Sequence, residues 1–67
     1  MITLTINGEP RTLPGPLDCA ALIRTLGYAG KRVAIERNGE IVPRSRLADE
    51  TLTDGDRLEI VVAVGGG

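Results

Sequence analysis

Apolar and polar residues alternate at the beginning of the chain. Every second residue from 2 to 6 is isoleucine or leucine, which is the period of a strand with one buried face. Asn7 and Gly8 follow, and this dipeptide favours a two-residue hairpin turn because both of its positions require positive φ. Pro10, in the return segment, fits only an edge strand or the start of a strand. We therefore predict a β-hairpin over residues 1–13.

The apolar period then changes from two to between three and four. Residues 17–26 place leucine, isoleucine and alanine on one side of a helix. Asp18 lies in the first turn and Arg24 in the last, in agreement with the helix dipole. Gly27 is a natural stop, since helices commonly end at a residue with positive φ. These features predict an amphipathic helix.

Strand patterns return in the second half of the chain. Residues 33–37 and 40–42 flank Asn38 and Gly39, which predicts a second hairpin.

The remaining residues lead to a final strand. We interpret residues 44–50 as a polar connection with Leu47 as its one large anchor, and residues 54–56, Asp-Gly-Asp, as a tight turn. The latter lacks the twelve-residue spacing and late glutamate of a calcium loop. Residues 58–64 alternate and are the most apolar stretch, so we expect this strand to be central.

The order of elements is strand, strand, helix, strand, a short strand, and strand. A sheet with one helix across one face is the simplest way to bury these apolar stripes. The prediction is an α+β protein of the β-grasp (ubiquitin-like) type, with a mixed sheet of four to five strands and one main helix on one face. We assign residues 1–64 to this domain and residues 65–67 to a flexible C-terminal glycine tail.

Composition excludes several classes of function. Of the 67 residues, 8 are basic and 9 acidic, none is histidine and one is cysteine. This leaves no zinc site of the Cys/His kind, no disulfide within the chain and no imidazole base. A net charge of −1 and a single aromatic residue argue against nucleic-acid binding. We expect a cytoplasmic monomer without a signal peptide or membrane span.

The final three glycines are the first candidate for chemistry. Such a run at one fixed place is expected by chance in about one of several thousand chains. Without Cβ atoms it is thin, and residues 63–67 can extend up to roughly 16–18 Å. The carboxylate of Gly67 could therefore enter a partner's active site, with Val64, Gly65 and Gly66 in the channel. A frayed terminus or a tag remnant is the alternative interpretation.

Two small apolar residues precede this tail. Val61 and Ala63 point to the face opposite the core if the strand alternates, which makes them possible partner contacts. The alternative is a partly covered face. Arg44, with Arg37 and Arg46, forms a basic cluster around a proline; we favour solvated loop charge there over a partner contact.

Cys19 and Tyr28 are the other reactive side chains. Cys19 lies among apolar helix residues, so we expect a buried, inert thiol, although a helix N-terminus can lower a thiol pKa. Tyr28 follows the helix stop, and we expect it to be a partly buried anchor.

One segment identifies a family resemblance. Residues 33–44, Val-Ala-Ile-Glu-Arg-Asn-Gly-Glu-Ile-Val-Pro-Arg, resemble the A-x-x-x-N-x-x-x-V-P-R signature of the thiamine-biosynthesis sulfur carrier proteins. Leu52, the turn at residues 54–56 and the glycine-rich ending continue the resemblance over nearly the whole chain. The chain departs from the pattern at Leu47, where many relatives carry tryptophan.

The resemblance implies a mechanism. The Gly67 carboxylate would be adenylated by an E1-like enzyme that uses ATP and magnesium, so the chain itself would bind no cofactor and no metal. Sulfur from a donor such as a cysteine desulfurase would then give a C-terminal thiocarboxylate. Thiazole synthase would take that sulfur for the thiazole ring of thiamine. The chain would be a co-substrate and not an enzyme.

Three alternatives remain open at this point. The chain could serve another sulfur pathway, as the small subunit of molybdopterin synthase does. It could be a ubiquitin-like modifier that is joined to lysines through Gly67. It could also be an interaction module whose tail has no chemical role.

Overall fold

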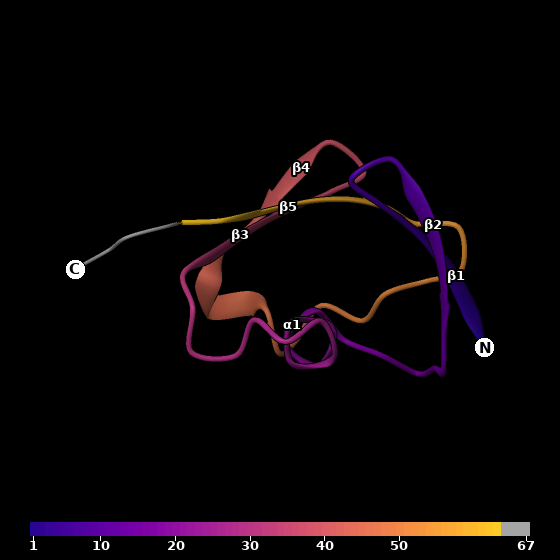
Figure 1. Cartoon of the computed structure of the whole chain (residues 1–67), viewed down its shortest axis with the longest axis horizontal. Coiled ribbons are helices and arrows are strands. Elements are labelled where there is room, and N and C mark those ends of the chain that lie inside the picture. The colour runs from indigo at the N-terminus through magenta and orange to yellow at the C-terminus, as the bar shows by residue number, and fades with distance from the viewer. Residues whose placement is uncertain (64–67) are drawn as a thin grey trace.

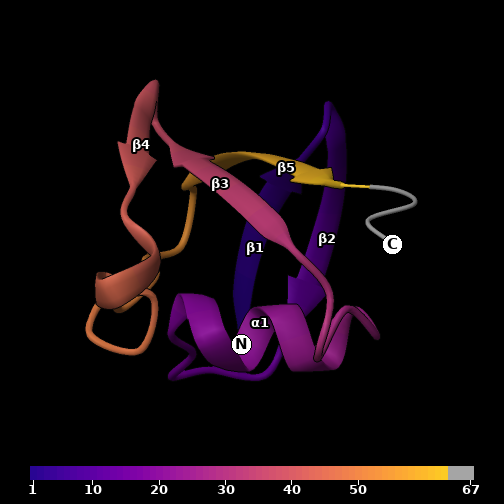
Figure 2. The ribbon, with the colours of Figure 1, turned by 90° about the vertical axis from the view of Figure 1, so that its left-hand side faces the viewer.

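The predicted order of elements and the β-grasp architecture are confirmed. In a computed structural model, residues 1–63 are described, and they form a five-stranded mixed sheet with α1 against one face (Figures 1 and 2). The sheet order is β2-β1-β5-β3-β4, with β5 in the centre as expected. The elements are β1 (Ile2–Ile6), β2 (Glu9–Leu13), α1 (Cys19–Thr25), β3 (Val33–Arg37), β4 (Glu40–Val42), the 3-10 helix η1 (Arg44–Arg46) and β5 (Arg57–Val62).

Both predicted hairpins form around Asn-Gly turns. Asn7 and Asn38 have φ of 50° and 52°, and the glycines that follow them have φ of 84° and 87°. β1 and β2 pair antiparallel with Thr5 opposite Pro10, and β2 is an edge strand, as the proline requires.

The two turn asparagines also bind the central strand with their side chains. Asn7 accepts a hydrogen bond from the Ile60 N–H at 2.7 Å and donates one to the Ile60 carbonyl at 3.1 Å. Asn38 accepts from the Arg57 N–H at 2.9 Å. β1 ends at Ile6, and its parallel pairing with β5 covers only two residue pairs. The Asn7 amide therefore continues the hydrogen bonding along β5 where the backbone of β1 stops.

The helix is shorter than predicted. α1 runs from Cys19 to Thr25, and Leu17 and Leu26 flank it as half-buried residues packed on the core. Asp18 is its N-cap and not a first-turn residue: its carboxylate accepts from the Ala21 N–H at 2.7 Å. The capping bond explains the later start, because it satisfies an amide that has no partner within the helix.

The core fills the space between α1 and the sheet. Leu4, Leu22 and Leu58 are fully buried, and the same cluster contains Cys19. Burial, with a smaller contribution from the Glu50 carboxylate, raises the pKa of the Cys19 thiol to about 11. The expected burial of the thiol is thus confirmed. Tyr28 is half-buried against the core, as predicted.

The Asp-Gly-Asp turn before β5 is hydrogen-bonded to β1. Gly55 has φ of 92°, which confirms a tight turn. Asp54 accepts from the Thr3 N–H at 2.6 Å, and the Gly55 N–H donates to the Thr3 carbonyl at 2.8 Å. The turn is therefore fixed to β1 directly before β5 begins.

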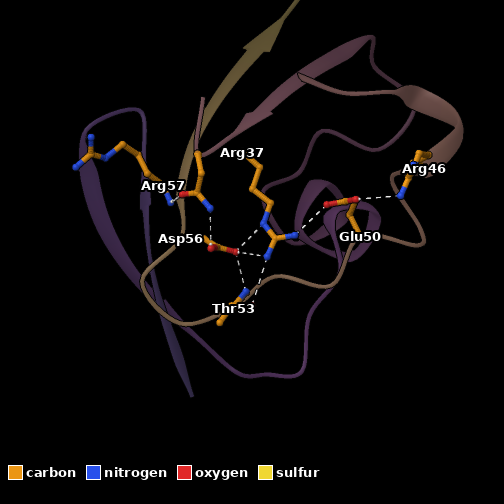
Figure 3. A network of polar contacts seen from close by, with 7 residues as sticks. Arg37, Arg46, Glu50, Thr53, Asp56 and Arg57 are labelled. Carbon is orange, nitrogen blue, oxygen red and sulfur yellow. Dashed lines mark hydrogen bonds and ion pairs between the residues drawn. The ribbon is translucent and has the colours of Figure 1, made fainter. Parts of the chain in front are cut away.

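Asp56, in the same turn, is the centre of a polar network (Figure 3). Its buried carboxylate accepts from the Arg37 guanidinium and the Thr53 N–H, each at 2.8 Å, and from the Asn38 amide at 3.0 Å. Burial alone raises the pKa of Asp56, but the hydrogen bonds and the charge of Arg37 outweigh burial and leave this pKa below its usual value. The network joins the end of β3 to the start of β5.

The predicted basic cluster is divided in the structure. Arg37 also pairs with Glu50 at 2.9 Å, and this hydrogen bond is the main reason that the pKa of Arg37 is raised. Arg46 approaches Glu50 at 3.6 Å. Arg44 has no part in this network. The expectation of solvated loop charge was therefore wrong for Arg37. The connection after β4, predicted as polar, contains η1.

Replacing Asn7 by glycine separates the two roles of the turn asparagine. Glycine keeps the positive φ but removes both hydrogen bonds to Ile60, so we expect Asn7→Gly to lower the free energy of unfolding by about 1–2 kcal/mol. Urea unfolding at neutral pH measures this change. Equal or greater stability than wild type would mean that only the turn conformation matters.

Stability should depend on pH through Asp56. The folded pKa is lowered, so its contribution is complete above the unfolded value of about 3.9 and is lost as pH falls through the folded pKa. Asp56→Asn should lower the free energy of unfolding at neutral pH by about 2–3 kcal/mol and flatten its decline in acid. Urea unfolding from neutral pH to about pH 2 tests both effects. Parallel curves for the two proteins would contradict this role.

Candidate functional site

The outward residues at the end of β5 form the base of the predicted tail. Val61 is 64% exposed, and Ala63, just after the strand, is exposed as well. The Ala63 N–H donates to the Arg32 carbonyl at 2.9 Å, which extends the pairing of β5 with β3 to the last described residue. Val64, Gly65, Gly66 and Gly67, the predicted tail and sulfur-attachment residues, lie outside the described residues.

The three predicted partner contacts lie together. Val61, Ala63 and Arg44 line a shallow groove of about 300 Å³ on the outer face of the sheet. The end of β5 and the start of β3 lie at the same end of the molecule (Figure 1), and Arg44, the first residue of η1, lines the groove with them.

The structure adds residues to this groove that sequence analysis did not select. The other lining residues are Arg32, Val33 and Ala34. Ala34 lies opposite Val61 in the antiparallel register of β3 and β5. The apolar alternation of both strands was visible in the sequence, but the register that joins them was not.

A second groove adjoins the first and shares Val33 and Arg44 with it. It has a volume of about 270 Å³ and lies between the end of α1, the loop before β3, and Leu47. Leu47 is half-buried against the core, so the predicted anchor is confirmed. Arg24 and Lys31 also line this groove.

The described residues offer little chemistry of their own at this site. The groove of Val61 and Ala63 is lined by apolar side chains and two arginines, and the one thiol of the chain is buried in the core. Within residues 1–63 there is no group of histidine, cysteine, aspartate or glutamate side chains arranged to hold a metal ion. The same residues contain no helix long and apolar enough to cross a membrane. The arrangement is suited to contact with another molecule.

Comparison with known proteins covers almost the whole chain. The model of the ThiS family matches residues 4–67. A thiazole synthase from Paramagnetospirillum magneticum is 48% identical over 64 residues, which are 96% of this chain but only 20% of that protein. The chain thus spans about a fifth of the length of that relative.

Two further relatives match over nearly their full length. The sulfur carrier protein ThiS of Thermus thermophilus is 36% identical over 62 residues, which are 92% of this chain and 95% of the carrier. The crystal structure of a thiamine biosynthesis protein (ThiS) from Geobacter metallireducens, also 36% identical, superposes with a TM-score of 0.82 and covers 98% of this chain and 100% of that chain. Sequence and fold therefore agree that this chain belongs to the ThiS family of sulfur carrier proteins.

Proposed function

We propose that this chain carries sulfur as a thiocarboxylate on Gly67 and delivers it for formation of the thiazole ring of thiamine. The observation that carries the proposal is the match to the ThiS family, which extends from residue 4 to residue 67 and so includes the glycines. The exposed end of β5 supports it, because β5 leads directly to these residues. The division into a domain of residues 1–64 and a tail of residues 65–67 belongs to the same proposal.

The proposed chemistry begins with activation of a poor electrophile. A carboxylate oxygen of Gly67 attacks the α-phosphorus of ATP in an E1-like partner, and pyrophosphate leaves. The acyl-adenylate then has AMP as a leaving group. ATP and magnesium belong to the partner in this scheme.

Sulfur enters at the carbonyl carbon of Gly67. The terminal sulfur of a persulfide, supplied by a donor such as a cysteine desulfurase, displaces AMP. A thiol then cleaves the sulfur–sulfur bond and is oxidised to a disulfide, which leaves the thiocarboxylate. The chain is regenerated when the sulfur is transferred, so it acts as a co-substrate.

Thiazole synthase is the recipient that the comparisons favour. A protein of that name contains a segment 48% identical to this chain, and joining two proteins in one chain raises the effective concentration of each for the other. This relation gives no comparable support to a molybdopterin-type carrier or to a modifier of lysines.

The reach of the tail fits delivery into a channel. Four fully extended residues beyond Ala63 span at most about 13–14 Å. A carboxylate at that distance enters a partner's active site while Val61, Ala63 and Arg44 contact the partner's surface. Glycines pass a narrow constriction because they lack side chains.

The intact mass of the protein tests the attachment site. After incubation with the purified adenylating enzyme, ATP and a persulfide donor, we expect a gain equal to the replacement of one oxygen by sulfur. A chain without Gly67, and one with an alanine added after Gly67, should not gain it. Gly67→Ala should fold normally but react more slowly, because its methyl group must enter the channel.

Other masses would contradict the proposal. Adducts with whole proteins would indicate a modifier of lysines. An unchanged wild-type mass, with a carrier of known activity converted by the same enzyme, would indicate an interaction module.

Val61 and Ile41 form a matched pair for testing the contact surface. Both are exposed apolar residues on strands, at 64% and 75%, but only Val61 lines the groove at the end of β5. Val61→Ser should lower kcat/KM for adenylation about tenfold through KM, since about 1.4 kcal/mol of binding is lost. Ile41→Ser should leave it unchanged. Equal effects of the two substitutions would mean that Val61 does not contact the adenylating enzyme.

A further inference from the structure

Four of the eight basic residues gather around the two adjoining grooves. Arg32 and Arg44 line the groove of Val61 and Ala63, while Arg24, Lys31 and again Arg44 line the second. All four side chains belong to exposed residues. We call these four residues the cationic rim.

Among the described residues, the grooves bordered by the rim are lined by no acidic side chain. The ion pairs found among residues 1–63 involve Arg37 and Arg46, and none involves a residue of the rim. The concentration of positive charge is therefore local, because the whole chain has a net charge of −1.

The charge on the outer face of the sheet changes sign along β3 and β5. Glu36 lies directly opposite Glu59, two register positions beyond the Ala34–Val61 pair. Both glutamates line a separate pocket on this face. Like charges directly opposite one another are unfavourable in a sheet, but Arg57 lines the same pocket and supplies a cation beside the two glutamates.

The floor of the first groove favours a protein as the occupant. Between the arginines lie the apolar side chains of Val33, Ala34, Val61 and Ala63. An apolar centre with a charged rim is the usual anatomy of a protein interface. Nucleic acid presents mainly phosphate and sugar, and a protein with net negative charge attracts it poorly.

We propose that the cationic rim binds an acidic surface around the channel of the adenylating enzyme that receives the tail; this proposal rests on the proposed function. The location supports it, because the Arg32 carbonyl accepts the hydrogen bond from Ala63, directly before the tail. Opposite charges on the two surfaces would speed encounter and align the tail with the channel mouth.

Charge reversal with a matched control tests the rim. The rim variant is Arg32→Glu with Arg44→Glu, and the control is Arg11→Glu with Arg57→Glu, which changes the net charge equally. Arg11 is on β2, and Arg57 begins β5 at the end remote from the rim. Binding to the immobilised adenylating enzyme without ATP is measured at low and at physiological salt, and urea unfolding checks both folds.

We expect the rim variant to raise Kd at least about tenfold at low salt, and the control to raise it less than about threefold. The salt dependence of binding should also weaken in the rim variant. Equal losses in the two variants, or no binding by the wild-type chain, would overturn the proposal. Tighter rim-dependent binding to duplex DNA or to phosphatidylserine vesicles than to the enzyme would overturn it as well.

The mass measurement separates this inference from the proposed function. Rim-dependent binding without sulfur on Gly67 would reject the carrier chemistry and retain the docking surface. If sulfur is transferred normally and the rim substitutions leave binding unchanged, the docking surface is rejected and the carrier chemistry is retained.

Discussion

The position of β5 depends on a short pairing that side chains must complete. β1 and β5 run parallel and share only the pairs Thr5–Arg57 and Ile6–Leu58. Beyond them, the Asn7 side chain satisfies both the N–H and the carbonyl of Ile60. On the other edge, five residue pairs join β5 to β3. The last strand in the chain is thus fixed by the turn of the first hairpin and by the whole length of β3.

The turn that precedes β5 determines where this strand begins. Asp54 binds β1, and Asp56 binds Arg37 and Asn38 at the end of β3. The two carboxylates therefore fix the start of β5 from both sides. For a chain of this length, net stability is about 3–10 kcal/mol, so one partly buried ion pair with several hydrogen bonds is a substantial share of it.

Local patterns in the sequence predicted the elements, because each element has a period or a turn signal of its own. The two Asn-Gly turns, the edge position of Pro10 and the central position of β5 follow from such signals. Asp18 was predicted in the first turn of the helix, whereas it is the N-cap and its carboxylate accepts from the Ala21 N–H. The signal is nevertheless present in the sequence, because aspartate is among the residues preferred at an N-cap, where its carboxylate accepts from an amide three residues on.

Interactions between distant residues were not predictable in the same way. Arg37 and Asp56 are separated by 19 positions, and nothing in the local pattern joins them. Arg37 was therefore grouped with its neighbours in sequence, Arg44 and Arg46. For the site, alternation identified Val61 and Ala63 as outward residues. Arg32 remained hidden because its place depends on the register between β3 and β5.

Alternate residues of β5 contribute to the core and to the exposed surface, so stability and partner contact depend on different side chains of the same strand. Leu58 and Ile60 point into the core, while Glu59 and Val61 point outward. The cationic rim lies at the far end of this strand from the Asp56 network. Repulsion among the rim cations opposes folding of the free protein, and an acidic partner would remove that repulsion on binding. Charge that is unfavourable in the free chain thereby becomes favourable in the complex, which is how a small domain with little spare stability can still favour one partner and one orientation.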